Sequence, residues 1–486
     1  MTAMEGLRLD LDRSSRHDLA HVKRLLERLH GDLEFRERAR EAPSDRATLV
    51  ETAGVDLSPA DLKPFWDLLD AERGTAEARG AASDALRTHP LGALWQTWNR
   101  EQLEWHRTAA AEWVPDGDRR LTAWRRRRLV RARSESLAET EGNIFPLLAF
   151  ELSKGCSTQC WFCAWDPPKL EGTFPYTPEN RRLWRGLLGA AWDLFGPGAR
   201  TAICYHATEP TDNPDYFSFV ADVRELYGIR PHTTTARPLK DLAFTRELLR
   251  LQDVPPPSFD RFSVLTLASL LKIHQAFSAE ELLNVNFVLQ NREALSTKVR
   301  SGRTLENEER LVAEARLVRD ELPLTIRPLG TIECTCGYLV NLVDRSIRLV
   351  SPCHASKRWP FGYVVHLEGT FQNASEFREF VLRSIEECMR EHLEEGERLA
   401  FREDLAYERR SGGFVVRSPF REHGVNGGPG VTLLGELVAE GTLTTGQITE
   451  RMIQDGMPAL EVVSWLDRLH QGGLLADAEV LQAKAR

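Results

Sequence analysis

Residues 148–163 read LAFELSKGCSTQCWFC, and this stretch decides how the rest of the chain is interpreted. Its first five residues form a short, largely apolar run of the kind that becomes a buried strand. Cys156, Cys160 and Cys163 then follow within eight residues of one another. The stretch therefore predicts a strand that leads into a loop carrying three thiols.

The C-x3-C-x2-C spacing of these thiols suits an iron–sulfur cluster. Three thiolates can hold three corners of a [4Fe–4S] cube and leave the fourth iron without a protein ligand, open to a substrate. The alternative is a structural zinc ion, which needs a fourth ligand to complete its tetrahedron. Cys204 or His206 could supply that ligand, although neither stands at a usual zinc-finger spacing. The spacing favours the cluster and keeps zinc as the alternative.

Beyond this stretch, short apolar runs alternate with longer amphipathic segments. The runs lie at residues 145–152, 201–205, 262–267, 285–289 and 324–326. Strands that alternate with helices predict βα units and a parallel sheet, and the spacing allows about six such units before residue 340. We therefore expect an α/β fold with a partial (β/α)6 TIM-like barrel, whose chemistry gathers at the carboxyl ends of the strands.

The composition predicts two flanking domains. Residues 1–140 read as successive helices, one of them starting at Ser58-Pro59, where serine can cap and proline fits the first turn. The arginine run at 125–128 is expected to be a solvated helix face, or else a docking surface for an acidic partner. Residues 141–395 hold the barrel with a C-terminal catalytic extension. Residues 396–486 end in three short helices that fit a small winged-helix-like module, although a strand hairpin before them is not evident.

The composition also excludes several classes of protein. The net charge is −9 and the last predicted helices carry no basic recognition face, so nucleic acid is not an expected partner. No apolar run approaches the roughly 18 residues of a membrane span, and the charged first residues lack a secretory signal. Eight cysteines are too few for a disulfide scaffold. We therefore expect a cytoplasmic protein with no membrane partner.

The cysteine stretch resembles the signature of the radical S-adenosylmethionine (SAM) superfamily. The resemblance implies that the three cysteines hold a [4Fe–4S] cluster and that SAM binds its open iron. Residues 206–210, HATEP, are similar to the Gly-Gly-Glu-Pro element that receives the SAM amino group in this superfamily, with both glycines replaced. By the same resemblance, the residues expected to contact SAM are Phe162, Thr208, Glu209, Thr234, Ser263, Thr266 and Ile332.

A closer resemblance extends over roughly residues 20–390. The strings AFELSKGCSTQCWFC, ATEPTDNPDY, TTTARPLKD and SIRLVSPCHASKRWPFGY are similar to the radical SAM peptide epimerases of the polytheonamide type. This resemblance implies an isomerase that removes a Cα hydrogen from an L-residue of a ribosomally made precursor peptide. A cysteine thiol then returns hydrogen from the opposite face and leaves a D-residue. One departure is Ala164, which stands where the family often has a further cysteine after the cluster motif.

Within that resemblance, Cys353 matches the position of the hydrogen donor, and Cys334 and Cys336 are the next candidates. The competing interpretation of Cys353 is a buried, inert thiol. The implied partners are a precursor peptide with leader and core, and an external one-electron reductant such as flavodoxin or ferredoxin. The C-terminal module distantly resembles winged-helix elements that recognise such leaders.

Two other functions stay open. The radical chemistry could end in Cα or Cβ cross-linking, hydroxylation or cleavage instead of inversion. A more remote alternative is an interaction protein with a structural zinc site. Near the cysteines, Asp212 and Asp215 are expected to cap the following helix.

Overall fold

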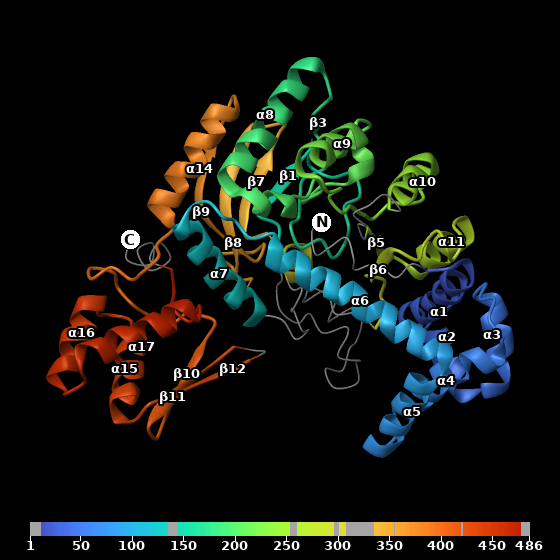
Figure 1. Cartoon of the computed structure of the whole chain (residues 1–486), viewed down its shortest axis with the longest axis horizontal. Helices are drawn as coiled ribbons and strands as arrows, with labels where there is room; N and C mark the ends of the chain where they lie inside the picture. The colour runs from blue at the N-terminus through green and yellow to red at the C-terminus, as the bar shows by residue number, and fades with distance from the viewer. Residues whose placement is uncertain are drawn as a thin grey trace.

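The fold is given by a computed structural model, drawn in Figure 1. It describes residues 11–134, 144–252, 260–295, 301–307, 335–353, 355–418 and 421–477. A central group of strands is flanked on one side by the first helices and on the other by the C-terminal module (Figure 1). Among the described residues, no helix combines the length and the apolar character needed to cross a bilayer.

Helices fill the chain before the first strand, as the sequence predicted. They are α1 (Arg13–Gly31), α2 (Leu33–Glu41), α3 (Arg46–Thr52), α4 (Pro59–Ala71), α5 (Ala76–Thr88), α6 (Pro90–Glu112) and α7 (Arg119–Ser134). The start of α4 is confirmed, because the Ser58 side chain caps it by accepting the Asp61 N–H at 3.2 Å. Apolar residues of α1 pack against α6 and against the segment between α11 and β6, so the first helices are joined to the parallel strands.

Parallel strands occupy three of the predicted apolar runs, at β1 (Leu148–Glu151), β5 (Asp260–Val264) and β6 (Val285–Leu289). A fourth strand, β4 (Thr234–Thr235), lies outside those runs, and the predicted run at 201–205 contributes only the bridge residue Ile203. The helices between them are α8 (Pro178–Phe195), α9 (Tyr216–Tyr227), α10 (Leu242–Leu251) and α11 (Leu267–Ala276). Strands β4, β5 and β6 pair in parallel, and Ala149 of β1 forms a parallel bridge with Ile203. The chain is thus α/β with parallel βα units, while the predicted run at 324–326 lies outside the described residues.

An antiparallel extension continues the sheet on the other side of β1. Its strands are β7 (Gly337–Asn341), β8 (Ser346–Pro352) and β9 (Tyr363–Thr370), followed by α14 (Ala374–Cys388). Strand β7 pairs with β1 in parallel, and β8 and β9 follow antiparallel. The main apolar core lies between this sheet and helices α7, α8 and α14. The sequence analysis assigned no strands here.

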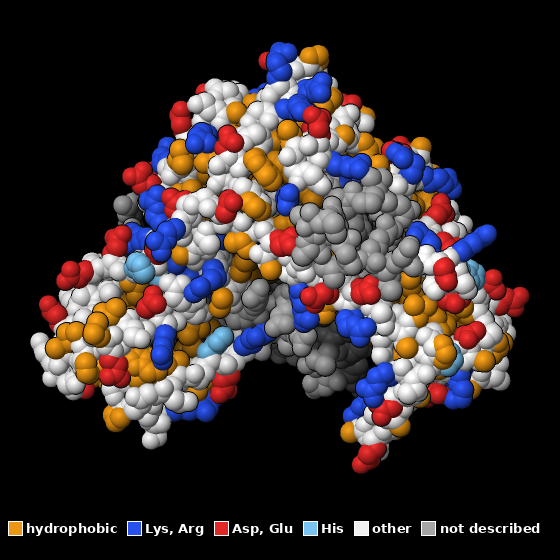
Figure 2. All heavy atoms as spheres, viewed as in Figure 1, with side chains coloured by type: hydrophobic (Ala, Val, Ile, Leu, Met, Phe, Trp, Pro, Cys, Tyr) orange, Lys and Arg blue, Asp and Glu red, His pale blue; other side chains and the backbone are white. Residues whose placement is uncertain are grey.

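The C-terminal module has its own core. Strands β10 (Ala406–Arg410), β11 (Gly413–Arg417) and β12 (Glu422–Asn426) form an antiparallel sheet. They are followed by α15 (Pro429–Glu440), α16 (Thr445–Gln454) and α17 (Ala459–Gln471), which match the predicted helices. Leu460 and Val463 of α17 are 86% and 55% exposed, and Figure 2 shows hydrophobic side chains on this part of the surface.

The prediction that the arginine run of α7 is a solvated face is wrong. Arg125 is buried and donates to the backbone carbonyls of Phe145 and Cys336. Arg128 and Arg131 meet the buried carboxylate of Asp477. The run therefore joins α7 to the sheet and to the C-terminal module, because buried carbonyls and a carboxylate there need cationic donors.

Candidate functional site

A cavity of about 610 Å³ runs along the inner face of the parallel strands. The cysteine loop lies at the carboxyl end of β1, and the inward residues of β5 and β6 form one wall. Trp105 and His106 of α6 contribute another part of the lining. Parallel α/β folds place their chemistry at this end of the strands.

Neighbouring side chains fix the position of the cysteine loop beside this cavity. Asp212 accepts hydrogen bonds from the backbone N–H of Ser157, at 2.9 Å, and from its hydroxyl. Lys240 contacts the same carboxylate at 3.0 Å. The predicted helix-capping role of Asp212 is wrong. Its carboxylate fixes the residue after the first cysteine of the motif.

All three cysteines of the motif line the cavity, and their environment disfavours bare thiolates. Burial raises the pKa of Cys156 and of Cys163. Burial, together with the two neighbouring thiols, raises the pKa of Cys160 to about 12. Thiolates here need a bound cation to offset their burial and mutual repulsion, which is what a metal cluster provides.

The three cysteine sulfurs are not all as close to one another as the ligands of a single zinc ion would be. Among the described residues, one group of three metal-ligating side chains has its ligand atoms within 4.8 Å of one another, and it does not contain the cysteines. Sulfurs around one zinc ion would lie about 3.8 Å apart, given Zn–S bonds of about 2.3 Å. The proposed fourth ligands are also misplaced, because Cys204 is buried in the main core and His206 contacts Glu151 at 3.3 Å.

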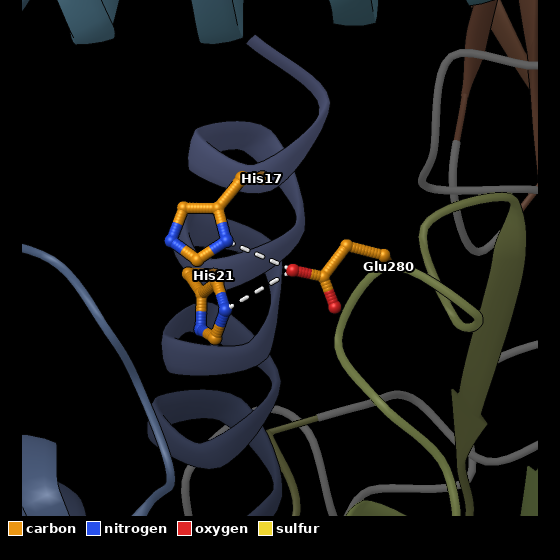
Figure 3. A group of neighbouring side chains, drawn as sticks. All are labelled: His17, His21 and Glu280. Atoms are coloured by element: carbon orange, nitrogen blue, oxygen red, sulfur yellow. Dashed lines mark hydrogen bonds and ion pairs between the residues drawn. The ribbon is translucent and has the colours of Figure 1, made fainter. Parts of the chain in front are cut away.

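The group that does lie within 4.8 Å comprises His17, His21 and Glu280 (Figure 3), and we call it the histidine clasp. The Asp56 N–H donates to His21 Nδ1 at 3.0 Å, so neutral His21 carries its proton on Nε2, facing Glu280. Both nitrogens of His17 face oxygens, at 2.9 Å from Glu280 Oε1 and 3.0 Å from the Asp56 carbonyl. Because the nitrogens that face Glu280 carry protons, the clasp is an ion pair and not a metal site.

Glu209 is where the resemblance placed a contact to the SAM amino group. Its carboxylate is buried, so it is not an ordinary exposed residue at a strand end. Burial raises its pKa, although hydrogen bonds from Thr235, at 2.6 Å, and from the Ala236 N–H, at 2.9 Å, act in the opposite direction. A buried carboxylate in a cavity wall is a suitable partner for an ammonium group.

Ala207 adopts a backbone conformation that glycine favours. Its φ of 51° lies in the left-handed region that glycine adopts without strain. The element therefore has the conformation of a glycine turn even though its sequence, HATEP, has none. This strengthens the likeness on which Glu209 was selected.

Only some of the other residues predicted to contact the cofactor line this cavity. Phe162, Thr208, Thr234 and Ser263 line the cavity together with the cysteines and Glu209. Thr266 is exposed and instead caps α11 by accepting the Ser269 N–H at 3.0 Å. Ile332 lies outside the described residues.

The candidate hydrogen donors do not line this cavity. Cys353 is buried and borders a second cavity of about 430 Å³ between the end of β8 and the C-terminal module. Its N–H donates to the Gly362 carbonyl, and in the same segment the Pro360 carbonyl accepts from Gly302, which is next to the cysteine loop. Cys336 is fully buried in the main core and lines neither cavity, and Cys334 lies outside the described residues.

Two polar atoms of the cavity wall have no internal partner. Thr158 Oγ1, between two cysteines of the motif, and Gln290 Oε1, at the end of β6, are buried and accept no hydrogen bond within the described chain. Buried polar atoms are normally satisfied. Together with the thiol set, these atoms indicate that a polar ligand completes the cavity.

These features define a class of protein, an α/β chain with a thiol-lined cavity at the ends of parallel strands. Residues 399–473 match the family described as "Protein y4wI C-terminal domain". The chain is 35% identical over 469 residues to the uncharacterized protein y4wI of Sinorhizobium fredii (strain NBRC 101917 / NGR234), covering 95% of this chain and 88% of that protein. The chain therefore belongs to the y4wI family.

Among solved structures, BtrN in complex with AdoMet and 2-DOIA is similar over 50% of this chain and 81% of that chain, with 12% identity. The TM-score of 0.27 is too low for this similarity to carry an argument.

Proposed function

We propose that this chain is a radical SAM enzyme. The observation that carries the proposal is that Cys156, Cys160 and Cys163 open into the cavity that also holds the buried Glu209. Three thiols would hold a [4Fe–4S] cluster, and the carboxylate would receive the amino group of SAM. When bound, these groups supply a primary carbon radical that abstracts hydrogen from a substrate.

The chain's own residues would bind and orient SAM. Phe162 offers an aromatic ring to the nucleoside, and Thr234 and Ser263 offer hydroxyls from neighbouring strands. Thr158 Oγ1 and Gln290 Oε1 supply the polar atoms that still lack a partner within the described chain. The buried walls keep water from a reactive radical.

We further propose that the reaction is inversion of L-residues in a ribosomally made precursor peptide. Removal of hydrogen from one face of Cα leaves a carbon radical, and the S–H of Cys353 returns a hydrogen atom to the other face. The resulting thiyl radical regains one electron from an external reductant such as flavodoxin or ferredoxin, and one proton from water. For this role, the target residue has to reach both cavities past the segment at 359–362, which touches the cysteine loop through Gly302.

The C-terminal module would hold the peptide leader. Support comes from its arrangement, a three-stranded sheet (β10–β12) followed by α15–α17 within the described residues, and from the exposed Leu460 and Val463. The module and Cys353 line the same second cavity, which supports a role for the module in holding a peptide near this thiol.

Anaerobic reconstitution tests the radical SAM proposal. The purified chain should bind iron and inorganic sulfide in equal amounts, and should release 5′-deoxyadenosine from SAM under strong reduction. Cys160→Ala should abolish both, whereas Cys204→Ala, which removes a thiol from the core, should not. A protein that binds zinc and no sulfide would overturn the proposal and favour the interaction protein.

Reaction with the cognate precursor in deuterated water tests inversion. Each inverted residue should gain one deuterium at Cα, because the thiol hydrogen exchanges with solvent, and should show no other mass change. Cross-linking would instead lower the mass, and hydroxylation would add an oxygen. Cys353→Ala should abolish inversion while SAM cleavage continues, and unchanged inversion would show that another group is the donor.

A further inference from the structure

Arg303, of the short helix α12 (Arg303–Glu306), contacts the cysteine loop at several points. Its backbone N–H donates to the Cys163 carbonyl at 2.9 Å, and its Nη1 to the Cys160 carbonyl at 3.2 Å. Its Nη2 donates to Gln159 Oε1 and to the Pro167 carbonyl, each at 2.8 Å, and its Nε to the Asp166 carboxylate. One guanidinium therefore spans the loop from the second cysteine to beyond the third.

The two loop residues whose side chains Arg303 binds are both strained. Gln159 has a φ of 50° and Asp166 a φ of 41°, in the left-handed region that residues other than glycine seldom adopt. Such conformations persist only where surrounding contacts fix them. The Arg303 side chain supplies such a contact at both ends of the loop.

Gly302 allows this approach. Its φ is 51°, and a Cβ atom there would lie 2.6 Å from the Cys163 carbonyl oxygen and 2.5 Å from that of Ala164. Only glycine lets the backbone come this close, so the chain before Arg303 is built against the loop.

The pair formed by Arg303 and Asp166 also places opposite charges beside the thiols. Their side chains are only 15% and 29% exposed, so solvent screens them weakly. A positive charge near a metal–thiolate site favours the more negative, reduced state, and a negative charge disfavours it.

We infer that Arg303 is a positioning residue of the cysteine loop, and that its pair with Asp166 balances the charge at the metal site. The inference rests on the proposed function for the metal, but the loop geometry can be tested without it. Lysine keeps the positive charge, but its single ammonium group cannot replace the planar guanidinium that donates hydrogen bonds to several separate acceptors.

The first experiment measures amide hydrogen exchange of residues 157–167 in the iron-free full chain. Arg303→Gln should speed exchange of the loop at least about tenfold, since two or more hydrogen bonds from a charged group are lost. Arg303→Lys should speed it less, and Arg126→Gln, an exposed control on α7, should leave it unchanged. Unchanged exchange in Arg303→Gln would overturn the positioning role.

The second experiment measures the midpoint potential of the reconstituted metal site by redox titration. Arg303→Gln removes the positive partner of the Asp166 carboxylate and should lower the potential. Asp166→Asn should raise it, and the double variant should return toward the wild-type value. Shifts of the same sign in both single variants would overturn the charge balance. A wild-type chain that binds no iron would defeat the proposed function alone, because the exchange experiment tests the loop independently.

Discussion

The two regions that flank the central strands are attached to the rest of the molecule by different kinds of charge. On the N-terminal side, α1 contacts the turn before β6 through the histidine clasp, and Glu27 accepts a hydrogen bond from His274 of α11 at 2.9 Å. On the C-terminal side, Arg128 and Arg131 of α7 meet Asp477. The N-terminal attachment is therefore made by histidine side chains, and the C-terminal attachment by arginine side chains.

This difference sets how each attachment responds to pH. The paired arginines hold the pKa of Asp477 well below its usual range, against the effect of burial. Burial lowers the pKa of the adjacent His366 and His470 to about 3, so both stay neutral. The C-terminal attachment is therefore constant near neutral pH, whereas the clasp gains and loses a proton there.

The largest expected effect is from Asp477→Asn. It leaves two mostly buried guanidiniums facing a neutral amide, which should lower the free energy of unfolding by about 3 kcal/mol. Urea denaturation followed by tryptophan fluorescence measures the change. The exposed Asp467→Asn on α17 is the matched control and should change stability by less than about 0.5 kcal/mol. Equal stability of the two variants would show that Asp477 does not hold the module in place.

An intermediate effect is expected from Glu27→Gln, on the opposite side. Burial by itself would raise the pKa of Glu27, but Lys23 and His274 lower it on balance, so its ionised form stabilises the fold. The variant should lose about 2 kcal/mol at neutral pH. Because the folded pKa is lowered, this contribution is present above the ordinary value of 4.5 and disappears as the pH falls through the folded pKa. Unfolding curves of the two proteins should therefore converge in acid, and a constant difference would contradict the assignment.

The smallest effect is expected from the clasp. Burial lowers the pKa of His17, but hydrogen bonds to Glu280 and to the Asp56 carbonyl raise it overall. Its stabilisation is therefore complete below the ordinary value of 6.5 and is lost as the pH rises through the folded pKa. The side chain is 35% exposed, so we expect less than about 1 kcal/mol after solvent screening.

His17→Gln tests this assignment. The variant should flatten the decline of the melting temperature between neutral and mildly alkaline pH. A decline of the same size in the variant would assign the effect to another group. Nuclear magnetic resonance titration of the His17 ring gives its pKa directly.

Local signals predicted much of the central fold and site. The strand at 148–151 and the loop after it were predicted from a short apolar run and its neighbours, because strand and loop preferences act within a few residues. The cap at Ser58 was found for the same reason. Each of these features depends on neighbours in sequence. Glu209 was selected by a resemblance to a family motif, and its role stays a prediction.

Features that depend on distant contacts were missed. The arginine run of α7 reads as a solvated face until Asp477, over 340 residues away, is brought beside it. Arg303 meets Asp166 across 137 residues, and no motif marks it. Strands β7, β8 and β9 are stabilised by pairing with β1 and with one another, so their local pattern did not show which sheet they extend.

Helix α6 links two parts of the molecule that would otherwise act separately. Its 23 residues form a rod about 35 Å long, packed at one end among α1, α4 and α5. Near its other end, Trp105 and His106 are part of the cavity wall. A tilt of the first helices relative to the strands would therefore move Trp105 and His106 and change the shape of the cavity.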